Sequence, residues 1–94
     1  MNPEIRHDRA RNRFEAIVDG HLCTADYQLR GDVLWMMHTG VPETVGGRGV
    51  AARLVQAALD WAEGQGWRIE PACSYVAAYM RRHPQTLKLL ARDR

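Results

Sequence analysis

Long apolar runs are absent from this sequence of 94 residues, and no stretch of about 18 apolar residues is available to span a membrane. The first residues, MNPEIRHDRARNRF, are charged and lack the apolar segment of a secretory signal peptide. The length suits one small domain, which excludes multi-domain enzymes and repeat arrays. We therefore expect a soluble, cytoplasmic protein with no membrane partner.

Cysteine and lysine are also scarce. Cys23 and Cys73 could form at most one disulfide, and a reducing cytoplasm disfavours even that one. The two cysteines and four histidines are not spaced like zinc ligands, so we expect no metal site. Among the 13 basic residues Lys88 is the only lysine, and the net charge is +2. Arginine suits phosphate, but arginines scattered over every segment are explained more simply by a codon bias.

Residues 1–12 are polar and carry three arginines beside Glu4 and Asp8. A basic arm for nucleic acid is one interpretation. The acidic residues dilute the charge, however, and no aromatic side chain is present to stack on bases. We expect a solvated N-terminal segment over 1–12 and a single domain over 13–94, and we do not expect a nucleic-acid partner.

Three stretches are typical of β-strands. Residues 14–18 and 23–30 alternate between apolar and polar side chains, and each is followed by a turn signal that pairs glycine with aspartate. Residues 33–39 are apolar on both faces, which predicts a strand in the middle of a sheet with cover on each side. The short turns between these stretches indicate an antiparallel meander.

A glycine-rich loop over 40–49 separates the strands from a helical pattern. Residues 50–62 carry an apolar stripe at helical spacing, with Arg53 among the polar residues opposite it. A short strand over 67–70, a helix over 74–82 and a last short helix from Pro84 follow. The sequence thus predicts an α+β (α/β) fold of order β-β-β-α-β-α with a short C-terminal helix, built on a mixed, mostly antiparallel sheet.

The loop and the helix start, HTGVPETVGGRGVAARLV, form the most informative stretch. Backbone N–H groups of Gly46, Gly47, Arg48, Gly49 and Val50 are expected to be unpaired there, where the helix dipole favours an anion. The Arg48 side chain could add a charge-assisted contact. The loop has neither the Gly-Lys-Ser/Thr of a Walker A motif nor the spacing of a Rossmann fingerprint. A phosphate cradle and a flexible turn with a glycine cap both fit this pattern.

Several short motifs, taken together, resemble GCN5-related N-acetyltransferases, and specifically the short YjdJ-type branch of that superfamily. They are Phe14-Glu15, His38-Thr39-Gly40-Val41-Pro42-Glu43, Gly46-Gly47-Arg48-Gly49-Val50-Ala51, Pro71-Ala72-Cys73-Ser74-Tyr75-Val76 and Tyr79-Met80-Arg81-Arg82-His83-Pro84. The resemblance covers nearly the whole chain from residue 13 to residue 90. It implies the minimal acetyltransferase fold, with acetyl-CoA as co-substrate and an amine as acceptor.

The resemblance also assigns the loop. In the superfamily the motif Gln/Arg-x-x-Gly-x-Gly/Ala holds the pyrophosphate of acetyl-CoA, and here Gly49 and Ala51 match its last two fixed positions. Gly46 stands where the motif has Gln or Arg, so only the backbone can contribute there. Residues 40–42, Val41 among them, would pair with the pantetheine arm. The branch lacks the helices that larger members place between the first two strands, so we expect an open acceptor pocket.

Cys73 is the first candidate for chemistry, because it lies at the predicted start of a helix, where the pKa of a thiol is lowered. It could accept the acetyl group transiently, line the thioester pocket, or be an ordinary small buried residue. The resemblance places the matching cysteine near the thiol of CoA, which supports the location of Cys73 more than its role.

Four other side chains are candidates. The resemblance implies that a tyrosine on the last long helix protonates the CoA thiolate; Tyr79 is that candidate, Tyr75 is a rival one turn earlier, and either could be a core tyrosine. His38 beside the loop suits a general base, although strand parity places it on the same face as Met36, where it could be a core residue. His83 could meet the 3′-phosphate of CoA.

Three functions follow from these observations. The first is an acetyl-CoA-dependent N-acetyltransferase acting on an amine of a small molecule or a protein. The second is a non-catalytic acyl-CoA-binding or sensing module. The third and least favoured is nucleic-acid binding through the N-terminal arginines. A monomer and a homodimer are both compatible with the sequence.

Overall fold

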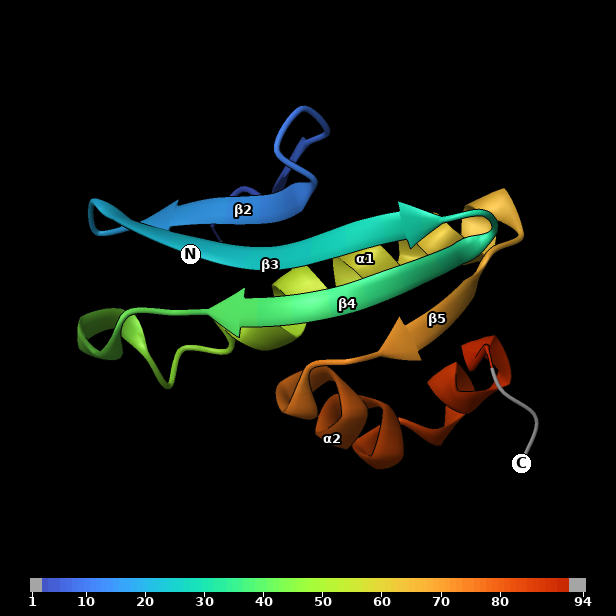
Figure 1. Cartoon of the computed structure of the whole chain (residues 1–94). Helices are drawn as coiled ribbons and strands as arrows, with labels where there is room; N and C mark the ends of the chain where they lie inside the picture. Colours follow the sequence, from blue (N-terminus) through green and yellow to red (C-terminus); the bar gives the residue numbers. More distant parts are fainter. Residues whose placement is uncertain (1–2, 92–94) are drawn as a thin grey trace.

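The computed structural model describes residues 3–91 and contains one five-stranded sheet with a long helix against one face (Figure 1). The strands are β1 (Arg6–Asp8), β2 (Arg13–Val18), β3 (His21–Arg30), β4 (Val33–Gly40) and β5 (Arg68–Pro71). The helices are α1 (Val50–Gln65) and α2 (Ser74–Arg82), with 3-10 turns η1 (Glu43–Val45) and η2 (Pro84–Leu89). Among the described residues no helix is long and apolar enough to cross a membrane.

The sheet has the order β1-β2-β3-β4-β5. The first three pairings are antiparallel, and β4 pairs with β5 in parallel, so α1 is the connection between two parallel neighbours. The predicted α+β fold with a mixed, mostly antiparallel sheet is confirmed, and the short helix predicted from Pro84 is present as η2. This topology brings the end of β4, the start of α1 and the start of α2 to the same side of the molecule (Figure 1).

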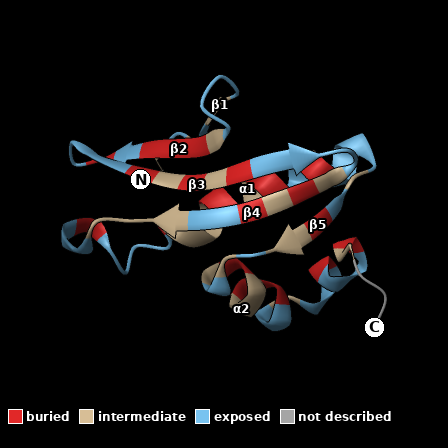
Figure 2. Cartoon of the chain, viewed as in Figure 1, coloured by how far each residue is buried: buried red, intermediate tan, exposed pale blue. Residues whose placement is uncertain are grey.

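The core lies between α1 and one face of the sheet. Alternate residues of the strands face it, as the two-residue period of a strand requires. Figure 2 shows this pattern as buried stripes on the strands and along α1. The buried set includes Phe14, Ala16, Cys23, Ala25, Leu34 and Met36 from the strands and Leu54, Val55, Ala58, Leu59 and Ala62 from α1.

The turn between β2 and β3 shows how local sequence sets the register. Asp19 and Gly20 both have positive φ, at 50° and 79°, which matches the tight hairpin turn that an Asp-Gly pair favours. The turn places Val18 opposite His21 and Phe14 opposite Ala25. Core residues of β2 therefore lie beside core residues of β3 at two positions, Phe14 beside Ala25 and Ala16 beside Cys23, whereas Val18 lies beside the exposed His21.

The N-terminal segment differs from the sequence prediction. We expected residues 1–12 to be solvated, but residues 6–8 form the edge strand β1. The ring of His7 stacks on Phe14 with centroids 4.0 Å apart, and its Nε2 lies 2.6 Å from the hydroxyl of Tyr27. The ring of His7 also meets Trp61 edge-on at 4.4 Å, and Arg6 forms an ion pair with Glu15 at 3.1 Å, so contacts with other segments dock a polar strand that has no apolar alternation of its own.

The outer face of β4 also differs from the prediction. We expected cover on both faces of this strand, but Figure 1 shows no helix in front of β2, β3 and β4. Trp35 is half-buried there, under the guanidinium of Arg30 at 4.2 Å from its ring centroid, and Met37 is 38% exposed. Ile17 and Leu22, which lie opposite each other on β2 and β3, are exposed as well, so this side of the sheet is open.

Candidate functional site

The start of α1 is an open helix N-terminus. Gly49 is its N-cap residue with φ of 78°, and Gly47 has φ of 79°, a backbone region that favours glycine. Neither a side-chain cap nor an acidic residue in the first turn is present. The N–H of Arg53 donates to the carbonyl of Gly49 at 3.2 Å, so the first-turn N–H groups before it have no partner within the helix. Together with the helix dipole they form a site suited to an anion.

Two predictions about the loop need correction. The N–H of Gly46, predicted to be unpaired, donates to the carbonyl of Glu43 at 3.1 Å, because η1 turns the chain there. The guanidinium of Arg48 forms an ion pair with Asp19 of the β2–β3 turn at 2.7 Å. A cavity of about 610 Å³ beside Arg48 is also lined by Glu4 and Asp19, so it is not a basic pocket. The anion-binding capacity of the loop thus begins after Gly46 and does not include a free Arg48 side chain.

The strands β4 and β5 separate after Met36. Their pairing ends where Met36 lies beside Pro71, whereas β4 continues to Gly40 (Figure 1). The chain then turns into α2, and the N–H of Cys73 donates to the carbonyl of Met36 at 2.9 Å. Residues 37–40 of β4 therefore have no strand beside them on that edge. A strand edge of this kind can hydrogen-bond an extended ligand.

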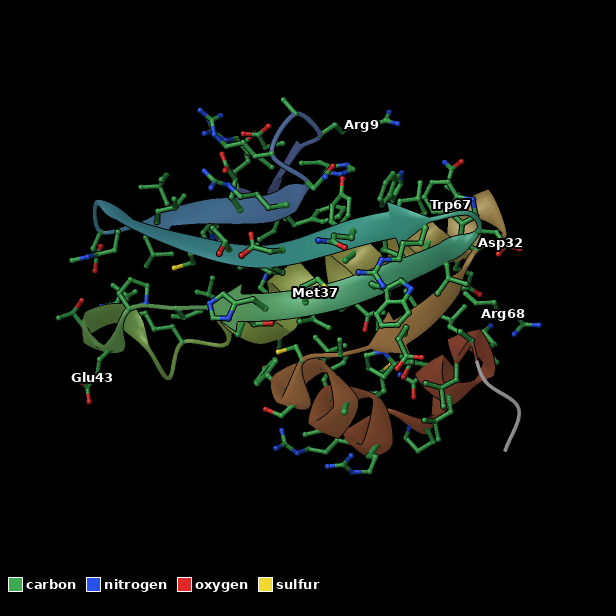
Figure 3. All side chains as sticks on the ribbon, in the orientation of Figure 1. Arg9, Asp32, Met37, Glu43, Trp67 and Arg68 are labelled. Carbon is green, nitrogen blue, oxygen red and sulfur yellow. The ribbon has the colours of Figure 1, made fainter. Side chains whose placement is uncertain are left out.

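A β-bulge in β4 decides which side chains face this separation. The β3–β4 register shifts so that Tyr27 lies opposite Met36 but Asp26 lies opposite His38, which leaves Met37 as the extra residue (Figure 3 labels Met37 on β4). The prediction that His38 shares the face of Met36 is therefore wrong. His38 is exposed and lies opposite Asp26, on the open face of the sheet.

The same bulge returns Thr39 to the side of Cys73. The hydroxyl of Thr39 lies 3.6 Å from Sγ of Cys73. Cys73 is the N-cap residue of α2, which agrees with its predicted position at the start of a helix. Burial is the largest single influence and raises the pKa of the thiol. Hydrogen bonds from the backbone N–H of Val76, the hydroxyl of Thr39 and the backbone N–H of Tyr75 outweigh burial, so the pKa of Cys73 is lowered.

Tyr79 faces α1. Its side chain is buried, its hydroxyl donates to Oε1 of Gln56 on α1, and the amide of Gln56 donates to Asp60 at 2.8 Å. Burial raises the pKa of Tyr79, and the nearby Asp60 and Tyr75 raise it further. The single proton of the Tyr79 hydroxyl is thus already donated within the protein, whereas half-buried Tyr75 lies one turn closer to Cys73.

His83 closes α2. Its ring stacks on Tyr79 with centroids 4.1 Å apart, and Nδ1 donates to the carbonyl of Tyr79 at 2.8 Å. The neutral ring then carries no proton on Nε2, so His83 can donate to a phosphate only as the imidazolium. Val41, the residue predicted to contact the pantetheine arm, is partly buried against the core beside the end of β4.

Sequence reasoning assigned no functional role to three residues that the fold brings to this region: Thr39, Gln56 and Arg53. Gln56 and Arg53 lie on the side of α1 that periodicity assigns to solvent, but the hydroxyl of Tyr79 on α2 reaches Gln56 on that side. Nη1 of Arg53 is fully buried and has no hydrogen-bond partner among the described residues. Within residues 3–91, no group of three or more His, Cys, Asp and Glu side chains is placed to hold a metal.

Comparison with known proteins identifies the family to which the chain belongs. The model of the family described as GCN5-related N-acetyl-transferase matches residues 13–89. Protein NATD1 of Gallus gallus is 30% identical over 84 residues, which cover 86% of this chain and 76% of that protein. Protein NATD1 of Homo sapiens is 30% identical over 83 residues, with 85% and 74% covered. The NMR structure of a GCN5-like protein from Staphylococcus aureus superposes with a TM-score of 0.78 at 23% identity, covering 99% of this chain and 92% of that one, and shows a shared fold.

Proposed function

Because the chain belongs to the family of GCN5-related N-acetyltransferases, we propose that it transfers an acetyl group from acetyl-CoA to an amine. The observation that carries the proposal is the meeting of three features at one end of the sheet: the open N-terminus of α1, the unpaired edge of β4 and the thiol of Cys73. The residues there fit CoA, because an anion, an extended amide-bearing arm and a thioester each find suitable groups.

The phosphates of CoA would be held by the first turn of α1. The N–H groups of Val50, Ala51 and Ala52 have no partner within the helix, and the glycines before them leave open space around the backbone. The amides of the pantetheine arm would pair with residues 37–40 of β4, where β5 has turned away. Together these groups would aim the thioester at the region between Thr39 and Cys73.

Transfer requires a neutral amine, a polarised carbonyl and a proton for the departing thiolate. Cys73 would lie beside the thioester, either lining its pocket or accepting the acetyl group before the amine does. Tyr75 would be the better proton donor, because Tyr79 already donates its proton to Gln56. His38 would reach the reaction only from the open face of the sheet, where it could take a proton from an approaching amine.

The open face favours one alternative. Since no helix covers the front of β2, β3 and β4 among the described residues, nothing there encloses an acceptor (Figure 1). A non-catalytic module that binds and senses acyl-CoA would have the same cofactor groups without needing an acceptor pocket. The two functions share a cofactor and differ only in turnover.

Thermal unfolding with acetyl-CoA tests both functions together, since a ligand that binds the native state raises its apparent stability. No stabilisation at millimolar acetyl-CoA would exclude both. If binding occurs, an assay against a library of amines, with intact-protein mass measurement, separates them. The enzyme predicts acetylated amine and a large loss of rate in Cys73→Ala and Tyr75→Phe. Cys23→Ala is the matched thiol control, because Cys23 is buried in the core. Binding without any acetylated amine would establish the sensing module instead.

A further inference from the structure

We propose that Arg53 is the side chain that binds the phosphates of the coenzyme, in place of Arg48. The inference rests on the proposed use of acetyl-CoA and adds a ligand residue to it. In the family motif a Gln or Arg precedes the glycines, and Gly46 stands at that position in this chain. Because Gly46 has no side chain, a polar side chain from another position would have to replace that contact.

The first argument is an unsatisfied hydrogen-bond donor. Nη1 of Arg53 is fully buried and has no partner among residues 3–91. Buried polar atoms nearly always have partners, because an unmade hydrogen bond to a desolvated charged group is costly. Because the described residues supply no acceptor for this nitrogen, its acceptor has to come from outside the chain, as a water molecule or as an oxygen of a bound anion.

The second argument is the pairing of the neighbouring side chains. Arg53, Gln56 and Asp60 succeed one another at helical spacing on α1, so they lie along one side of it. Gln56 accepts a hydrogen bond from Tyr79 on α2 and donates one to Asp60, so the side chains of Gln56 and Asp60 have partners within the protein. Arg53 lies one turn nearer the N-terminus of α1, and its Nη1 has no such partner among the described residues.

The third argument is charge. A cation near a helix N-terminus is unfavourable, because the helix dipole is positive there. The first turn of α1 has no acidic residue to offset Arg53, whereas Arg48 is neutralised by Asp19. An anion of at least two charges at this helix end would pair with the dipole and with Arg53 together. A pyrophosphate or phosphate ester has that charge, and guanidinium is suited to its oxygens.

The test compares binding of three probes to the wild-type protein and to Arg53→Gln, Arg53→Lys and Arg48→Gln by calorimetry. Acetyl-CoA carries the phosphates and the arm, S-acetylpantetheine carries only the arm, and adenosine 3′-phosphate 5′-diphosphate carries only the nucleotide end. Arg53→Gln is expected to lower the affinity for acetyl-CoA and for the nucleotide probe by about tenfold or more, because a charge-assisted hydrogen bond is lost. The affinity of Arg53→Gln for S-acetylpantetheine should stay within about twofold of the wild-type value, because no contact with this probe is lost.

Arg48→Gln is the matched control and should change all three affinities by less than about twofold, because its ion pair is exposed. Arg53→Lys should recover only part of the loss, since lysine lacks the planar fork. Without ligand, the melting temperature of Arg53→Gln should equal or exceed that of the wild type, because a smaller uncharged group replaces an orphaned charge.

Two outcomes would overturn the proposal while acetyl-CoA still binds the wild type. One is an equal loss of affinity for S-acetylpantetheine and acetyl-CoA in Arg53→Gln, which would place Arg53 on the arm or in the fold. The other is an unchanged affinity for the nucleotide probe in Arg53→Gln. If the wild type binds none of the probes at millimolar concentration, the proposed function fails first, and the role of Arg53 fails with it.

Discussion

The contact between Thr39 and Cys73 makes a quantitative prediction about the reactivity of the thiol. Thr39→Val removes the hydroxyl that lies 3.6 Å from Sγ and keeps the shape and the branched side chain that suit a strand. The hydroxyl favours the thiolate, so its removal raises the pKa of Cys73 and lowers the thiolate fraction at neutral pH. A hydrogen bond of this kind contributes about 1 kcal/mol, which corresponds to roughly a fivefold change in that fraction.

The assay is the rate of alkylation by iodoacetamide as a function of pH, read by mass spectrometry. Cys23 is buried and its pKa is raised by burial, so it should stay unmodified and report that the fold is intact. Thr39→Val is expected to react about fivefold more slowly below the pKa of the thiol and to reach half-maximal rate at higher pH. Thr39→Ser should restore the wild-type profile. An unchanged pH profile in Thr39→Val would show that the backbone N–H groups of α2 alone set the reactivity of Cys73.

Three further predictions concern stability, measured by urea unfolding. Gly49→Ala should lower the free energy of unfolding by about 1–2 kcal/mol, because Gly49 has a φ of 78°. Gly64→Ala, inside α1, should raise the free energy of unfolding by about 0.5–1 kcal/mol. Equal effects of the two substitutions would contradict the assignment of Gly49 as the N-cap residue. Tyr79→Phe should cost about 1 kcal/mol or more by leaving Gln56 without its donor, and a neutral change would show that this hydrogen bond is replaceable. The pKa of His7 is lowered below 6.5, first by burial and then by Arg9, with Asp8 opposing them, so the unfolded chain binds more protons. Stability should therefore fall as pH drops below about 6.5, more in the wild type than in His7→Phe, which keeps the stacking; parallel pH profiles would refute this.

Much of the fold could be predicted from the sequence because its periods are clear. The alternation of residues 14–18 and 23–30 and the stripe over 50–62 each reflect one face packed on the core, and the structure has these elements. The edge strand β1 could not be found in this way, since three polar residues carry no alternation. Its place depends on contacts between segments, among them those of His7 with Phe14 and Trp61, and not on a local pattern.

The elements of the candidate site could be predicted from the sequence, but the contacts of its side chains could not. The glycines before Val50 and Pro71 before Ser74 predict the starts of the two helices, and these starts set the positions of the unpaired N–H groups of α1 and of Cys73. The bulge at Met37 has no sequence signature, and it moved His38 to the open face and Thr39 toward the thiol. Periodicity places Arg53 on the solvent side of α1, because it describes only the stripe that faces the sheet and cannot show that Nη1 of Arg53 is buried.

A titration of the isotope-labelled protein with acetyl-CoA, followed through its backbone amide resonances, tests whether the end of the sheet is the cofactor site. The account predicts that the largest shifts fall on residues 47–52 at the start of α1, on 38–40 of β4 and on Cys73 at the start of α2. Amides of the β2–β3 turn and of η2 should move little. No shifts at millimolar acetyl-CoA, or shifts confined to residues away from these three segments, would contradict it.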